Sequence, residues 1–162
     1  MNRRPDADAE RERIDSGTLG PRRPSLPLHL HPRYVLVVVL GGVPGALARY
    51  GLGLALPAPS GWPLPTLVIN LAGAFVLGLL LEALARSGPD RGGRRILRLL
   101  VGTGFIGAFT TYSTFAVESA RLLATGRAVD SLAYLAASLV GGTLASGLGI
   151  WLGSARRARG AK

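Results

Sequence analysis

The sequence predicts an all-α membrane protein with four transmembrane helices, the third of which is broken near its middle. Of the 162 residues, 48% are hydrophobic, and arginine-rich segments alternate with long uncharged runs, as in multi-pass membrane proteins. One of these runs contains Gly102–Phe115, which reads GTGFIGAFTTYSTF. Its glycines and hydroxyls indicate irregular backbone in mid-membrane, which is tolerated only against protein or a polar cavity.

The composition excludes several kinds of site. The chain has no Cys, which excludes disulfides and thiolate metal sites. Its only histidines, His29 and His31, precede the first apolar run, so no histidine base or ligand lies in the spans. The net charge of +10 would also fit nucleic-acid binding, but the arginines flank apolar segments, and we therefore favour a membrane protein.

The chain divides into three parts. Residues 1–32 mix Arg, Asp and Glu and then become rich in proline, so we expect a disordered basic tail. Residues 33–153 hold the four spans and form the predicted transmembrane domain. Residues 154–162 form a second, short basic tail.

The first span, Tyr34–Leu56, is long enough to cross ~30 Å of hydrocarbon at about 1.5 Å per residue. Gly41, Gly45 and Arg49 lie four residues apart and therefore share one face. Small residues at this spacing let another helix approach closely. Arg49 either extends its charge to the membrane interface or attracts anions or caps a backbone break, and the sequence leaves both interpretations open.

The second span, Thr66–Ala85, carries a polar face. Thr66, Asn70, Ala74 and Gly78 fall on one side of the helix. A buried amide in lipid must find partners, so we expect this face to point inward. Asn70 either lines a pore or bonds one helix to another.

The third span runs from about Leu99 to Ala120. Its three glycines alone would fit a tightly packed helix. Hydroxyl and aromatic residues follow these glycines in Gly102–Phe115, and the combination favours a functional break. They are Thr110, Thr111, Ser113 and Thr114, with Tyr112 and Phe115.

The fourth span, Ser131–Gly153, has two possible inward faces. A mostly polar stripe and a small-residue packing seam are both present, and the sequence does not choose between them. The stripe consists of Tyr134, Ser138, Gly142 and Ser146, and the seam of Gly141, Gly142, Ala145 and Gly149.

Charge predicts the orientation. Four spans place both ends of the chain and the loop Arg86–Arg98 on one side, where sixteen of the nineteen Lys and Arg residues lie. Arg121 and Arg127 lie on the other side, and Arg49 lies inside a span. The positive-inside rule then puts both termini in the cytoplasm.

The spans offer hydrogen-bond donors and few ionisable groups. Glu82 and Glu118 lie toward span ends and the spans hold no His, Cys or Lys, so proton-coupled transport is disfavoured and an enzyme is not expected. Hydroxyls, one amide, one Arg and aromatic ring edges, which carry partial positive charge, suit a small anion.

Three ordered motifs then carry a resemblance. GGVPGALARY at Gly41–Tyr50, NLAGAFVLG at Asn70–Gly78 and GTGFIGAFTTYSTF at Gly102–Phe115 resemble the motifs of the Fluc, or CrcB, family of fluoride-specific ion channels. The resemblance covers about Tyr34–Gly153. It implies an antiparallel dimer of the dual-topology type, with two pores that export fluoride passively across the cell membrane.

The resemblance also implies roles for individual residues. At two positions this chain differs from the family pattern: Tyr112 stands where the family usually has Phe, and Gly142 stands where it often has a hydroxyl residue. A structural sodium ion would bind the carbonyls of Gly107 and Thr110. Fluoride would meet the amide of Asn70, the ring edges of Tyr112 and Phe115, and a hydroxyl track of Thr66, Tyr134, Ser138 and Ser113 or Thr114, while Arg49 matches the first-helix arginine.

Three questions stay open at this point. Copies inserted in both orientations need a weak Lys and Arg bias, and this chain has a strong one, so we favour a heterodimer with an oppositely oriented homologue over a homodimer. A small four-helix antiparallel multidrug or cation exporter is the alternative function, although it needs a mid-span acid. A membrane scaffold that transports nothing is the third.

Overall fold

The computed structural model describes residues 31–155, which form helices joined by short loops. The predicted tails lie almost wholly outside these residues. In chain order the elements are α2 Pro32–Ala55, the 3-10 turn η2 Pro59–Gly61, α3 Leu64–Ser87, α4 Gly93–Leu97, the π-helix η3 Arg98–Ile106, α5 Gly107–Phe109, α6 Tyr112–Ala124 and α7 Ala128–Ala155.

Four helical segments of the described region are long and apolar enough to cross a membrane. Their ends lie within a few residues of the predicted ones; the first ends one residue before its predicted end, and the other three are longer than predicted. Large apolar side chains are exposed on all of them, as expected of surfaces that face lipid. The prediction of a four-span, multi-pass membrane protein is therefore confirmed. The four segments are Pro32–Ala55, Leu64–Ser87, Gly93–Ala124 and Ala128–Ala155.

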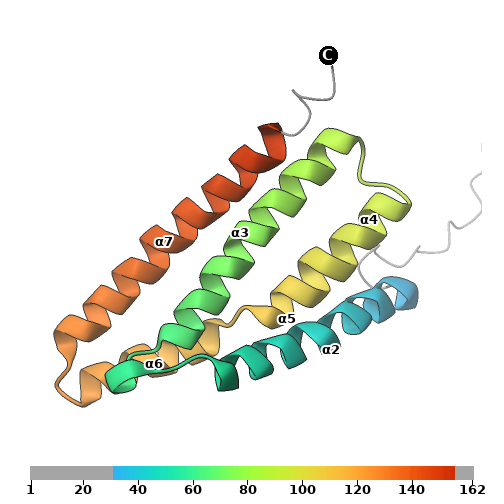
Figure 1. The fold of residues 1–162 in the computed structure, drawn as a ribbon. Helices are drawn as coiled ribbons and strands as arrows, with labels where there is room; N and C mark the ends of the chain where they lie inside the picture. The colour runs from blue at the N-terminus through green and yellow to red at the C-terminus, as the bar shows by residue number, and fades with distance from the viewer. Residues whose placement is uncertain (1–30, 156–162) are drawn as a thin grey trace, which may run out of the picture. The chain divides into compact units, whose positions relative to one another are not determined.

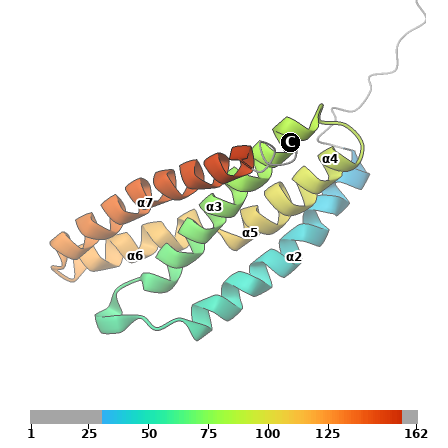
Figure 2. The same cartoon turned by 45° about the horizontal axis from the view of Figure 1, so that its top comes forward.

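The helices pack in two pairs (Figure 1). α3 lies along α7, and α2 lies along η3 and α5. A 45° turn of the view keeps both pairs side by side (Figure 2). The short helix α6 packs against the first turns of α7.

Glycines set the close contact between α2 and η3. A side chain at Gly41 would overlap the carbonyl of Leu100, and one at Gly45 would overlap the carbonyl of Phe105. Both glycines are buried. The expectation that this face receives another helix is confirmed.

Glycines of α7 show where the fourth span packs closely on α3. A side chain at Gly149 would overlap the Phe75 carbonyl, whereas one at Gly142 would meet nothing within 4 Å. The predicted seam is therefore in close contact at Gly149, and Gly142, which belongs to both the seam and the polar stripe, faces open space.

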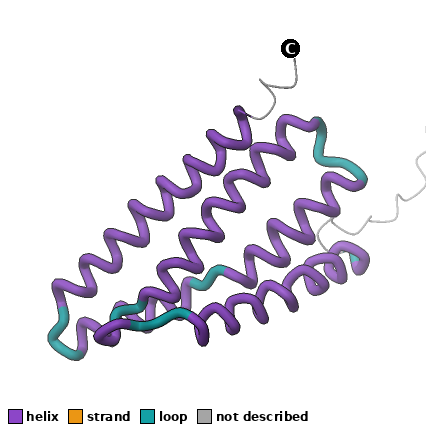
Figure 3. The backbone as a smooth tube through the Cα atoms, viewed as in Figure 1, coloured by secondary structure: helices purple, strands orange, loops and turns teal. Residues whose placement is uncertain are grey.

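The third span is interrupted between α5 and α6, where the tube in Figure 3 changes from helix to loop. Thr110 and Thr111 are both extended, with φ/ψ of −78°/159° and −148°/123°. The predicted break is confirmed, and it falls in the hydroxyl-rich half of Gly102–Phe115.

Candidate functional site

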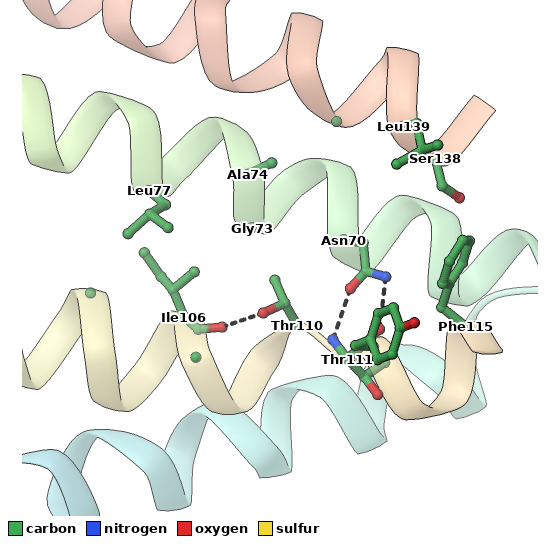
Figure 4. A pocket seen from close by; sticks show the side chains of 14 residues that line it. Asn70, Gly73, Ala74, Leu77, Ile106, Thr110, Thr111, Phe115, Ser138 and Leu139 are labelled. Atoms are coloured by element: carbon green, nitrogen blue, oxygen red, sulfur yellow. Dashed lines mark hydrogen bonds between the residues drawn. The ribbon is translucent and has the colours of Figure 1, made fainter. Parts of the chain in front are cut away.

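The side chain of Asn70, on α3, forms two hydrogen bonds with the main chain at the break of the third span. Its Nδ2 donates to the carbonyl of Thr111 at 3.0 Å, and its Oδ1 accepts from the Thr111 N–H at 2.8 Å (Figure 4). The Asn70 oxygen thus replaces the helical acceptor of the Thr111 N–H, and the Asn70 nitrogen adds a donor to the Thr111 carbonyl. Because an amide has two N–H hydrogens, one remains for a further acceptor. The structure therefore shows Asn70 as a link between helices.

Thr111 also begins α6. Its Oγ1 accepts from the N–H of Thr114 at 3.2 Å and donates to the Thr114 hydroxyl at 3.1 Å, and Ser113 Oγ lies 3.3 Å away. This is the N-cap arrangement that threonine favours. The hydroxyls of Ser113 and Thr114 therefore belong to the cap, and both residues are exposed.

The break leaves several main-chain carbonyls without their helical donors. In a continuous helix the Thr111 N–H would donate to Gly107 and the Thr114 N–H would donate to Thr110. Here those two N–H groups bond to Asn70 and to the Thr111 hydroxyl instead. The carbonyls of Gly107 and Thr110 thereby lose their helical donors, and these are the two that the family resemblance assigns to a sodium ion.

A cavity of about 450 Å³ lies at the break, between α3, the third span and α7 (Figure 4). Six of the predicted site residues line it. Among its described lining residues there is no carboxylate, guanidinium, ammonium or imidazole group. The cavity is thus an uncharged space with a few polar groups, and the six are Asn70, Gly107, Thr110, Tyr112, Phe115 and Ser138.

Ser138 contributes a hydroxyl that has no partner. Its Oγ is buried and forms no hydrogen bond within the described residues, and the residue lines the cavity. A buried hydroxyl without a partner costs about 1–3 kcal/mol. The arrangement therefore favours an acceptor bound next to Ser138.

Two aromatic rings of the cavity wall, Tyr112 and Phe115, are joined by ring contacts to Tyr134, which lies outside the cavity. The ring of Phe115 lies 6.1 Å from Tyr112 and 5.1 Å from Tyr134, centroid to centroid. Tyr134 is fully buried, whereas Tyr112 is 81% exposed in the single chain. Phe115 therefore connects the cavity with a buried polar cluster around Tyr134.

That cluster is centred on Glu118. Thr66 Oγ1 donates to Glu118 Oε1 at 2.9 Å, and the Tyr134 hydroxyl donates to Oε2 at 2.8 Å. Thr66 and Tyr134 are buried and do not line the cavity. Each hydroxyl has one hydrogen, so both donors are directed at the carboxylate.

Sequence reasoning missed the role of Glu118, because it treated the residue as lying near a span end. The available signal was an acid inside an apolar segment, three residues after Phe115, since such an acid needs partners. Arg49 lies elsewhere: it is half-buried on α2 and is not among the described residues that line the cavity.

Comparison with known proteins gives a consistent result. The family model described as "CrcB-like protein, Camphor Resistance (CrcB)" matches residues 36–150. The chain is 48% identical over 134 residues to "Fluoride-specific ion channel FluC 2" of Leifsonia xyli, an alignment that covers 83% of this chain and 92% of the relative. It is 47% identical over 118 residues to "Fluoride-specific ion channel FluC 1" of Cutibacterium acnes, covering 72% and 82%. It is 43% identical over 119 residues to "Fluoride-specific ion channel FluC 2" of Moorella thermoacetica, covering 72% and 93%.

Proposed function

Because this chain belongs to the CrcB family of ion channels, we propose that it is a fluoride-specific channel that exports fluoride passively and lowers cytoplasmic fluoride. The family is one of channels and not of enzymes. The observation that carries the proposal is the uncharged cavity at the break of the third span, with polar donors on its wall.

The cavity offers hydrogen-bond donors to an anion that loses its water. Fluoride holds its water tightly, so a pore must replace those hydrogen bonds with donors of its own. Ser138 has a buried hydroxyl without a partner, and Asn70 keeps one amide hydrogen beyond its bonds to Thr111. The ring edges of Tyr112 and Phe115 add partial positive charge. Together these groups support passage of a small anion without a fixed cation to trap it.

The same break fits a structural sodium ion. The carbonyls of Gly107 and Thr110 have lost their helical donors, and hard cations prefer oxygen ligands of this kind. Two oxygens from one chain are too few for such an ion, so a second copy of the break must complete the set. The ion would supply positive charge that stabilises the extended segment and would not itself be transported.

This incomplete ligand set supports a dimer in which two breaks meet. We favour an antiparallel arrangement, in which the partner is an oppositely oriented homologue. The strong Lys and Arg bias of this chain supports one orientation of insertion, with both termini in the cytoplasm. A homodimer is the second possibility.

The exporter alternative finds less support. A cation exporter needs an acid on its transport cavity, and the described lining of this cavity has none. Glu118 lies in the third span, but its two oxygens accept bonds from Thr66 and Tyr134. A lipophilic cation loaded into the same liposomes should therefore stay inside.

Fluoride efflux from liposomes tests the proposal. The chain is reconstituted alone and together with an oppositely oriented homologue from the same organism, and efflux is followed with a fluoride electrode. Replacing Phe115 with Leu should lower efflux about fivefold, because an aromatic edge contact contributes roughly 1 kcal/mol. Phe105→Leu is the matched control: Phe105 lies in the same span, stacks on Phe109 and does not line the cavity. Equal efflux from the two variants would remove Phe115 from the pathway, and the absence of fluoride efflux from every preparation would refute the channel.

A further inference from the structure

A second hollow lies beyond the cavity, where the loop before α3 meets the turn between α6 and α7. Its volume is about 340 Å³. It is lined by Gly61, Glu118, Arg121, Leu122, Thr125 and Arg127.

Glu118 joins this hollow to the central cavity. Its carboxylate holds Tyr134, whose ring contacts Phe115, and Phe115 lines the cavity. A continuous series of contacts therefore runs from the break to the hollow. On the proposed function, an ion that leaves the cavity past Phe115 next meets the hollow.

The two arginines of the hollow differ in their partners. Arg127 Nε donates to Asp130 at 2.8 Å, and its Nη1 donates to the Ser60 carbonyl at 2.9 Å, so this arginine ties the loop to the turn. The Arg121 side chain is exposed, and its guanidinium forms no hydrogen bond or ion pair with any described residue; its carbonyl is bonded, to Thr125. Of the two arginines that line the hollow, Arg121 is therefore the one whose charge has no partner among the described residues.

The negative charge of Glu118 in this hollow can be offset by a free cation. A carboxylate on the wall repels an approaching anion, and Arg121 follows it by three residues on α6, which places both side chains on one side of the helix. A unit charge within about 7 Å raises the local concentration of an opposite ion about threefold in water. The effect falls off over about 10 Å at 0.1 M salt.

We propose that the hollow is the mouth of the pore at the α6–α7 end, and that Arg121 concentrates fluoride there by offsetting the charge of Glu118. The inference rests on the proposed fluoride channel and adds a specific collecting residue to it.

The absence of cysteine from the chain allows a direct test by charge. Arg121→Cys is reconstituted and treated with a cationic or an anionic methanethiosulfonate of matched size. Untreated Arg121→Cys should show about threefold lower fluoride efflux than the parent at low ionic strength. The cationic reagent should restore efflux, and the anionic reagent should lower it further. The difference should vanish at 1 M of an impermeant salt, where charges are screened within about 3 Å.

Val129→Cys is the control, since Val129 is 80% exposed at the same turn and does not line the hollow; neither reagent should change its efflux. If both reagents change Arg121→Cys efflux equally while the parent conducts fluoride, the collecting role is wrong and the channel stands. If the parent does not conduct, the proposed function is wrong and this inference falls with it.

Discussion

At the scale of single residues, Asn70 shows how one side chain can stabilise an interrupted helix. Thr111 is buried, and without Asn70 its N–H would lack a partner; its carbonyl would keep the first main-chain bond of α6, which an N-cap residue accepts. A buried main-chain group without a partner costs about 1–3 kcal/mol. The second-span amide is therefore needed for the shape of the third span, whatever it also offers to an ion.

Replacing Asn70 with Ala should consequently loosen the break. We expect the Thr111 amide to exchange its hydrogen at least about tenfold faster, which corresponds to 1.4 kcal/mol, as measured by hydrogen-exchange mass spectrometry in detergent. Thr143→Ala is a suitable control, because the Thr143 hydroxyl only bonds back to Leu139 on an exposed helix face. Unchanged exchange at Thr111 in the Asn70 variant would mean that the extended backbone persists without the amide.

Glu118 is coupled to its two donors in the same way. Combining Glu118→Gln with Tyr134→Phe in a double-mutant cycle should give a coupling of about 1 kcal/mol, because the first change removes the charge of the acceptor and the second removes the donor of their shared bond. Thermal unfolding followed by tryptophan fluorescence measures it. Strictly additive effects would show that the 2.8 Å contact between the two side chains contributes nothing.

At the scale of helices, backbone contact between α2 and η3 depends on glycine. Gly45→Ala would place a methyl group on the Phe105 carbonyl, whereas Gly42→Ala meets Ala108 Cβ and the Gly104 carbonyl oxygen at an ordinary 3.8 Å. We expect the first variant to lose about 1–3 kcal/mol and the second to remain near the parent. The midpoint of thermal unfolding in detergent compares them, and similar midpoints would contradict the tight packing.

The same scale shows what the sequence could predict. Glycines followed by hydroxyls in Gly102–Phe115 predict a break, because both residue types weaken a helix in lipid. The π-helical stretch Arg98–Ile106 was not predictable, since apolar periodicity does not separate one hydrogen-bond ladder from the other. The Asn70–Thr111 and Thr66–Glu118 bonds join residues 41 and 52 positions apart, and such pairings depend on how the helices pack.

At the scale of the whole molecule, the distribution of basic residues predicts the orientation in which the chain inserts into the membrane. Sixteen of nineteen basic residues lie on the predicted cytoplasmic side. This asymmetry opposes insertion in both orientations, although the proposed sodium site needs two breaks that meet in a dimer. A single orientation would therefore require a partner that inserts the other way.

Single-cysteine variants test this orientation, because the chain has no other thiol. Ser87→Cys reports the end of α3, and Val129→Cys reports the turn before α7; both residues are exposed. An impermeant maleimide added to intact cells should label Val129→Cys fully and should label Ser87→Cys only after the membrane is permeabilised. Labelling of about half of each variant from outside would show insertion in both directions, and a homodimer would then be favoured over the heterodimer.

Replacing Arg94, Arg95 and Arg98 with Gln should move the labelling toward that mixed pattern, because it removes positive charge from the loop that contributes to the Lys and Arg bias.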